Sequence, residues 1–162
     1  MAIANNITRM LDSRKIKYAA YELPPEKLGA QETADLLGID ASIVFKTIVI
    51  TREKPKKPIL VVAPGTRIVD LKLVATAVGE KRVTLPTERE AETITGLQAG
   101  GISPLVLLNK GFMVLVDVSA QDLPEIHISG GQRGLNIKLG TADFLELTKA
   151  RFAAVTRPIS AA

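Results

Sequence analysis

The sequence predicts one α/β domain of mixed α+β type, in which a curled mixed β-sheet is covered by helices. Short β-rich runs outnumber helix-like segments along the chain. The connections include both short turns and helical crossovers, so antiparallel and parallel strand pairs are expected in the same sheet. The chain has 162 residues, of which 46% are hydrophobic, and this is enough to bury a core. We therefore expect residues 1–162 to form a single domain.

The first elements follow from hydrophobic spacing and from residues that end helices. A helix is expected at residues 2–13, where apolar residues recur at a spacing of three or four. A strand at 18–23 ends at a pair of prolines. A second helix, 30–37, ends at Gly38, which is expected in the left-handed conformation. After a short turn, the β-rich run 45–51 predicts another strand.

Charged and capping residues organise the middle of the chain. The charged, proline-broken segment 52–58 predicts a solvated hairpin tip leading into a strand at 59–63. A helix at 71–78 is expected to be capped by Asp70 and ended by a glycine. The capping-box pattern Thr87–Glu90 then begins a polar helix.

Strand pairs and a final helix are expected in the second half. The first two strands are joined by an Asn-Lys-Gly turn, which is a hairpin signal, and the next two flank a glycine-rich turn. Thr141 is expected to cap the last helix. The segment from Arg151 either adds a short strand or is loose. The expected elements are strands at 105–108, 112–118, 125–129 and 135–139 and a helix at 142–149.

Composition excludes several kinds of function. The absence of cysteine removes disulfides, thiolate metal sites and a cysteine nucleophile. A single histidine leaves zinc catalysis and a histidine-based triad without most of their groups, so we expect no metal and no cofactor. No apolar run has the length of a signal peptide or a membrane span, which predicts a soluble, cytoplasmic protein without membrane contact. The net charge of +4 is compatible with an anionic partner such as RNA.

The stretch Thr95–Pro104 holds three glycines, a serine and a proline between a helix-like segment and an apolar run. Glycine costs stability unless a tight φ or a close approach requires it. The pair Gly100–Gly101 can turn successive N–H groups toward one point and bind an anion or an ester carbonyl oxygen. A turn between a helix and a strand is the alternative, because glycine and proline are common there.

Three further features are candidates for chemistry. Lys46 lies among apolar residues, so its ammonium either reaches solvent or holds an anion. His127 alternates onto the face opposite Ile126 and Ile128, which predicts an exposed or rim residue rather than a base. The segment 130–134 forms either a hairpin turn or a phosphate cradle, and it lacks the strand-then-helix order of a P-loop.

Three separated motifs carry a family resemblance: Phe45–Thr47 on a strand, Thr95-Gly96 followed by Gly100–Pro104, and Ser129–Ile137. Together they resemble the signature of the YbaK/EbsC family of aminoacyl-tRNA editing domains, which also occur as an insertion in bacterial prolyl-tRNA synthetases. The resemblance runs from the first helix and Tyr21 to Phe152. It implies the YbaK and prolyl-tRNA-synthetase-associated editing fold, a pseudo-barrel covered by helices.

The resemblance also implies an activity and its residues. The activity is hydrolysis, in trans, of the ester joining a wrong amino acid to tRNA, with cysteinyl-tRNA(Pro) as the leading substrate. Lys46 would hold the 3′-terminal nucleotide or the aminoacyl end, and the Gly101 backbone would hydrogen-bond that end. No protein nucleophile is implied, because in the cysteinyl branch the substrate's own thiol attacks its ester. The implied substrate-binding residues are Tyr21, Leu28, Gly100, Ile102, Ser103, Pro104 and Asn136.

Two departures from the cysteinyl branch leave the amino acid open. Asn136 stands where that branch has Asp, and Leu28 stands near the position of an aromatic residue. Asn cannot act as an anion or a proton acceptor as Asp can. The alternatives are a deacylase for another small amino acid such as alanine, or a non-catalytic module that binds tRNA or prolyl-tRNA synthetase. The expected partners are therefore mischarged tRNA, most often tRNA(Pro), and in some of these alternatives prolyl-tRNA synthetase.

Overall fold

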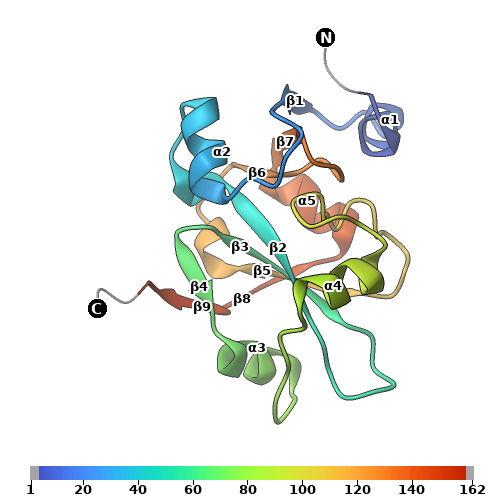
Figure 1. Ribbon diagram of the computed structural model, residues 1–162, viewed down its shortest axis with the longest axis vertical. Helices are drawn as coiled ribbons and strands as arrows, with labels where there is room; N and C mark the ends of the chain where they lie inside the picture. Colours follow the sequence, from blue (N-terminus) through green and yellow to red (C-terminus); the bar gives the residue numbers. More distant parts are fainter. Residues whose placement is uncertain (1–3, 160–162) are drawn as a thin grey trace.

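Three sheets and five α-helices make up residues 4–159, the part of the chain that this computed structural model describes (Figure 1). The sheets have the strand orders β1-β7-β6, β2-β3-β5-β8 and β4-β9. The strands are β1 (Tyr18–Glu22), β2 (Phe45–Ile50), β3 (Ile59–Pro64), β4 (Arg67–Val69), β5 (Met113–Asp117), β6 (Glu125–Ser129), β7 (Leu135–Gly140), β8 (Arg151–Ala153) and β9 (Thr156–Pro158). The helices are α1 (Asn6–Ser13), α2 (Ala30–Leu37), α3 (Leu71–Val78), α4 (Glu88–Thr95) and α5 (Thr141–Thr148).

The two larger sheets meet at their edge strands, β6 and β2. A parallel bridge between Val44 and His127 links the start of β2 to β6. Strand β2 pairs antiparallel with β3, whereas β5 pairs parallel with both β3 and β8. These pairings confirm the predicted mixed sheet of an α/β domain.

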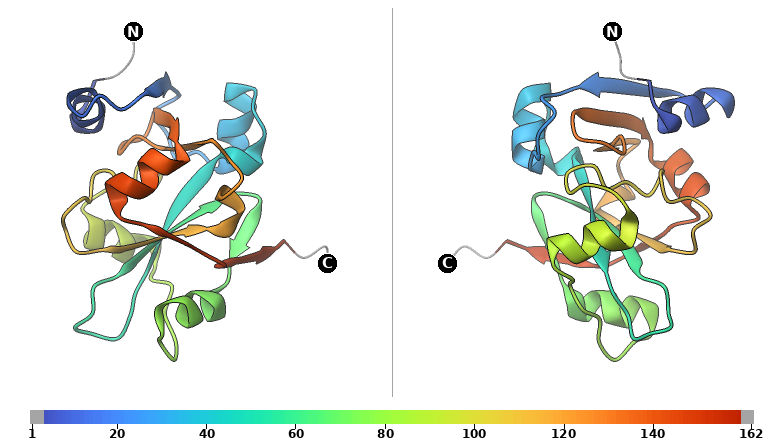
Figure 2. Two further views of the ribbon diagram at one scale, coloured as in Figure 1. Left: turned by 180° about the vertical axis from the view of Figure 1, so that it is seen from behind. Right: turned by 45° about the vertical axis from the view of Figure 1, so that its right-hand side comes forward.

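Strand β3 is buried on both faces, which explains why its sequence is continuously apolar. Leu60 and Val62 contribute to a core cluster that contains Phe144 of α5. Ile59 and Val61 point the other way, into a cluster that contains Val74 of α3. In Figure 2, α5 lies against the sheet and α3 lies at the end of the molecule away from α2.

Helix ends follow the capping residues that the sequence contains. Gly38 and Gly79 adopt the left-handed conformation at the ends of α2 and α3, as predicted. The Asp70 carboxylate accepts backbone N–H groups at the start of α3. Thr87 and Glu90 form the expected capping box of α4. At the start of a helix, a short polar side chain accepts hydrogen bonds from the free backbone N–H groups. At its end, glycine adopts the left-handed conformation without the steric penalty of a Cβ.

A buried carboxylate ties the end of β5 to the last two strands. Asp117 is only 1% exposed. One of its oxygens accepts from the Val155 N–H at 3.3 Å and from Thr156 Oγ1 at 2.9 Å. The other accepts from Ser119 N and Oγ, at 3.3 and 2.6 Å. Asp117 therefore fixes the link between β8 and β9 at the point where the chain leaves the main sheet.

The strand predicted at residues 105–108, and its hairpin to the next strand, are wrong. The chain there turns repeatedly, with Val106 N donating to Ser103 O and Leu107 N donating to Pro104 O. Leu105 and Leu107 are buried all the same. A four-residue apolar run does not distinguish a strand from a buried turn, and Pro104 favours the turn.

The ends of the domain differ from expectation in smaller ways. Helix α1 begins at Asn6 with Asn5 as its N-cap, whereas residues 2 and 3 of the predicted helix lie outside the described range. Thr141 does not cap α5 but is its first residue, and its hydroxyl donates to Leu123 O. The segment from Arg151 forms β8 and β9, and β4, the partner of β9, had no prediction.

Candidate functional site

A cavity of about 480 Å³ opens between α2, β2, α4 and the start of β7. This volume is in the range of small-molecule sites, and most of the lining is apolar. Its lining includes Leu28, Lys46, Gly100, Ile102, Ser129 and Asn136.

Five predicted site residues therefore share one cavity, although they come from four separate segments. They are Leu28, Lys46, Gly100, Ile102 and Asn136. The other four, namely Tyr21, Gly101, Ser103 and Pro104, are not part of its lining.

Lys46 is an exposed residue of β2 that lies between buried Phe45 and half-buried Thr47. Phe45 is buried in the core, and Val44 and Ile48 line the same cavity as Lys46. An ammonium group at the edge of an apolar wall is well placed to meet an anionic group that enters the cavity.

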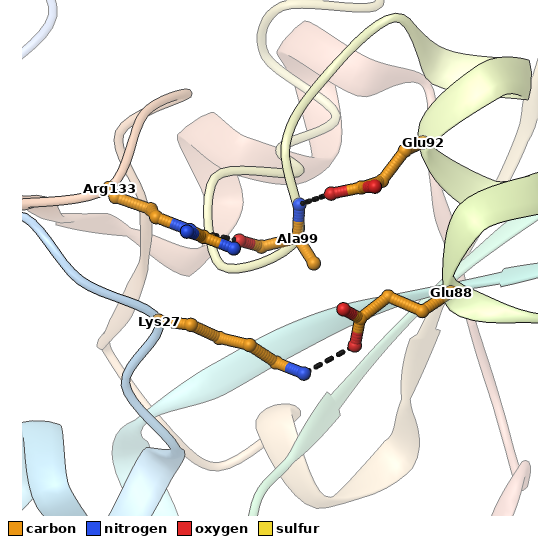
Figure 3. Close-up of polar contacts among 5 residues, drawn as sticks. All are labelled: Lys27, Glu88, Glu92, Ala99 and Arg133. Carbon is orange, nitrogen blue, oxygen red and sulfur yellow. Dashed lines mark hydrogen bonds and ion pairs between the residues drawn. The ribbon is translucent and has the colours of Figure 1, made fainter.

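The glycine loop after α4 is held from both sides at Ala99. The Ala99 N–H donates to the Glu92 carboxylate at 2.7 Å, and the Ala99 carbonyl accepts from Arg133 Nε at 2.7 Å (Figure 3). Gly100 follows in the left-handed region with φ of +88°, which favours glycine. Its carbonyl accepts from Ser129 Oγ at 3.4 Å. The loop is thus a fixed wall of the cavity.

An exposed ion pair lies at the same cavity. Lys27, which follows β1, pairs with Glu88 at the start of α4, as Figure 3 shows. Both side chains are exposed and both line the cavity. Exposed ion pairs contribute little stability, so this contact can open at small cost when a ligand enters.

The backbone at Gly101 does make a close approach, but to the protein itself. A Cβ at this position would lie 2.9 Å from Gln132 Cα and 3.2 Å from Arg133 N. The Gly101 N–H already donates to the Gln98 carbonyl at 2.8 Å. The Gly101 N–H is therefore engaged within the loop, and the close approach packs the glycine loop against the β6–β7 hairpin.

We expect Gly101→Ala to destabilise the fold, because a methyl group would push two backbone segments apart. Overpacking of this kind costs about 1–3 kcal/mol, which lowers Tm by about 3–10 °C in a domain of this size. Thermal unfolding measures the effect. The matched control is Gly29→Ala, where the added Cβ meets only Glu32 Oε1 at an ordinary 3.4 Å. Equal Tm values for the two variants would show that the Gly101 contact is not tight.

Ser103 and Pro104 are buried parts of the turn that follows the loop. The Ser103 hydroxyl accepts from Leu105 N at 3.3 Å, so it stabilises this turn. Tyr21 lies against His127, with ring centroids 5.7 Å apart, and lines a shallower hollow beside Leu37.

His127 is buried, which contradicts the prediction of an exposed or rim residue. It is 4% exposed, and its Nδ1 lies 2.8 Å from Asn136 Oδ1. Burial lowers the pKa of His127 below its ordinary value of 6.5, against a smaller opposite effect of the Asn136 hydrogen bond. On the face opposite Ile126 and Ile128, the Tyr21 ring and the Asn136 amide contact His127, and strand alternation alone cannot reveal such a cover.

The segment 130–134 forms the turn between β6 and β7, as the hairpin interpretation predicted. Its Arg133 holds Ala99 and was not singled out from the sequence, nor were Lys27, Glu88 and Glu92. The only sequence signal for these four residues is their charge, and charged residues are common in polar segments of this kind.

Residues 4–159 contain neither a cluster of candidate metal ligands nor a helix that could span a membrane. In this range no group of three or more His, Cys, Asp and Glu side chains is arranged to hold a metal ion. None of the helices in the same range is both long and apolar enough to span a membrane.

Comparison with known proteins gives consistent matches. The family model of the aminoacyl-tRNA editing domain matches residues 24–147. EbsC of Enterococcus faecalis, named as a candidate Cys-tRNA(Pro)/Cys-tRNA(Cys) deacylase, is 35% identical over 153 residues, which are 93% of this chain and 92% of EbsC. A proline–tRNA ligase of Thermodesulfovibrio yellowstonii is 31% identical over 81 residues, or 50% of this chain and 14% of the ligase.

Solved structures agree with the fold. A crystal structure of a candidate trans-editing enzyme for prolyl-tRNA synthetase has a TM-score of 0.78 and 25% identity, covering 96% of this chain and 99% of that one. The crystal structure of hypothetical protein APE2540 has a TM-score of 0.84 and 22% identity, covering 94% of this chain and all of the other.

Proposed function

This chain belongs to the aminoacyl-tRNA editing domain family, and from that premise we propose that it hydrolyses the ester of mischarged aminoacyl-tRNA in trans. Cysteinyl-tRNA(Pro) is the leading substrate, since the relative with 35% identity over 93% of the chain is named for it. The observation that carries the proposal is the cavity that gathers Lys46, Gly100 and Asn136 from distant segments.

Within this proposal Lys46 binds the anionic or polar end of the substrate. Its exposed ammonium at the cavity wall suits the terminal phosphate or the aminoacyl group, through a charge-assisted hydrogen bond. Leu28 and Ile102 contact the amino-acid side chain, and the fixed wall at Gly100 sets the depth of the pocket. The four predicted residues outside the lining support these walls: Tyr21, Gly101, Ser103 and Pro104.

The cavity lining contains no cysteine or histidine among the described residues. A substrate that carries its own thiol supplies a nucleophile to such a site, and for other amino acids the nucleophile that we propose is a water molecule. We further propose that the whole chain acts as one editing domain in the cytoplasm, where tRNA is charged, and that prolyl-tRNA synthetase is its docking partner.

The decisive experiment is deacylation of a panel of charged tRNAs: Cys-tRNA(Pro), Ala-tRNA(Pro), Cys-tRNA(Cys) and Pro-tRNA(Pro). We expect rapid loss of the cysteinyl ester on tRNA(Pro) and buffer-rate decay of Pro-tRNA(Pro). Faster loss of the alanyl ester would make alanine the edited amino acid. Decay of every ester at its buffer rate would favour the binding module instead, with the Asp-to-Asn departure at Asn136 as the cause.

Residue 136 is expected to influence which amino acid is removed, because its side chain lines the cavity. A placed polar group discriminates between substrates more strongly than an apolar wall, which separates small groups by only about 1–3 kcal/mol. We expect Asn136→Asp to raise the rate on Cys-tRNA(Pro) relative to Ala-tRNA(Pro). Both esters are measured in one buffer for wild type and variant, and an unchanged ratio would mean that residue 136 does not set specificity.

A further inference from the structure

A single hydrogen bond behind the cavity wall determines the protonation of a buried imidazole. His127 Nδ1 and Asn136 Oδ1 are 2.8 Å apart, and the two residues are only 4% and 5% exposed. An amide oxygen has no hydrogen to donate, so Nδ1 must carry the proton. Burial lowers the pKa of His127, which keeps the ring neutral near pH 7 and leaves Nε2 as the unprotonated nitrogen.

The same bond determines which way the Asn136 amide faces. With Oδ1 bound to His127, the two N–H groups of Asn136 Nδ2 point elsewhere. No group in the described range accepts from this nitrogen, yet no buried side-chain nitrogen or oxygen in residues 4–159 is without a partner. Nδ2 therefore keeps access to open space, and the open space that Asn136 lines is the cavity.

His127 is itself held in place by its neighbours. The Tyr21 ring packs on it at 5.7 Å with an interplanar angle of 35°. Tyr21 lies directly opposite Asn136 in the pairing of β1 with β7, so the three side chains form one layer on this face of the sheet. The charged groups that act on His127 are Lys138 on β7 and Glu125 on β6, and their effects on it are opposite in sign.

We infer that His127 is a positioning residue, which fixes the Asn136 amide so that its NH₂ group donates a hydrogen bond into the cavity. The group of the substrate bound there is accordingly an acceptor, and in an aminoacyl-tRNA the fitting acceptor is the ester carbonyl oxygen. This identification of the acceptor rests on the proposed function, whereas the fixed orientation of the amide does not. Aspartate at position 136 would keep the bond from His127 but turn an acceptor toward the cavity.

The orientation is tested without tRNA by nitrogen NMR, because the chain contains a single histidine. Long-range ¹H–¹⁵N spectra of the untagged protein at pH 7.5 are expected to show the Nδ1–H tautomer. Asn136→Leu removes the acceptor, so we expect the population to shift toward the Nε2–H form. An Nε2–H tautomer in the wild-type protein, or the same spectrum in both proteins, would overturn the inference.

Kinetics test the consequence for the reaction. His127→Phe keeps an aromatic ring against Tyr21 but cannot donate, whereas His127→Gln keeps a donor for Asn136 Oδ1. A hydrogen bond of ordinary strength contributes about 0.5–1.5 kcal/mol, so we expect His127→Phe to lower kcat about 2- to 12-fold with little change in KM. His127→Gln should recover part of this loss. Equal kcat values for the two folded variants would contradict the positioning role.

The two experiments separate the inference from the proposed function. If the wild-type protein hydrolyses no mischarged tRNA, the proposed function fails, and the tautomer still decides the orientation of Asn136. If hydrolysis is found but the tautomer is Nε2–H, the function stands and the role of His127 is wrong. Should His127→Phe fail to fold, the wild-type and Asn136→Leu spectra still give the answer.

Discussion

Lys46→Ala is expected to lower the rate of deacylation about 10- to 150-fold while leaving the fold intact. The physical reason is the loss of a charge-assisted hydrogen bond in a partly dry cavity, which is worth about 1.5–3 kcal/mol. The fold should survive because the Lys46 side chain is exposed and lies outside the core clusters. Single-turnover deacylation of Cys-tRNA(Pro) measures the rate, and thermal unfolding confirms that the variant is folded.

Two further variants distinguish a specific contact of Lys46 with the substrate from a general electrostatic attraction between the protein and tRNA. Lys46→Arg retains the charge but changes its geometry, so it should keep more activity than Lys46→Ala. Lys72→Ala removes an exposed lysine of α3, which does not line the cavity, and should react at nearly the wild-type rate. If Lys46→Ala and Lys72→Ala had the same small effect, Lys46 would act only through the overall charge of the protein.

Asp117→Ala is expected to cause the largest loss of stability, about 3–5 kcal/mol in the free energy of unfolding. The substitution leaves the Val155 N–H and the Thr156 hydroxyl without their acceptor in a buried place. Chemical denaturation measures this loss, and an unchanged slope with denaturant would show that the native state alone is affected.

The matched control for this experiment is Asp122→Ala, which removes an exposed carboxylate and should change stability by less than about 0.5 kcal/mol. Asp117→Asn keeps one acceptor oxygen but brings an NH₂ group toward the donors around Ser119, so an intermediate loss is expected. A loss for Asp117→Ala as small as that for Asp122→Ala would mean that water replaces the carboxylate.

Most of the secondary structure could be predicted because its signals are local. Helix α2 ends where Gly38 permits a left-handed residue, and α4 begins where Thr87 and Glu90 cap it. The strand at 105–108 could not be predicted correctly, because a short apolar run is compatible with any buried conformation. Strand β4 has only three residues and depends on β9, which lies far along the sequence.

The sequence could identify several residues of the candidate site, but it could not predict which groups these residues contact. The motifs identified Lys46, Gly100 and Asn136, and the structure places these three on one cavity. The burial of His127 could not be predicted, since the side chains that cover it come from other strands. The engagement of the Gly101 N–H by Gln98 is equally a property of the folded loop.

The pairing of β1 with β7 has a consequence for synthesis of the protein. Strand β1 is made well before its partner residues Leu135–Leu139, which lie far along the sequence. Pairings between such distant segments form slowly, because a long loop must close first. Since β7 also supplies Asn136 to the cavity, a nascent chain has no complete site. Hydrolytic activity toward charged tRNA is thereby withheld until β7 has been made and has paired with β1.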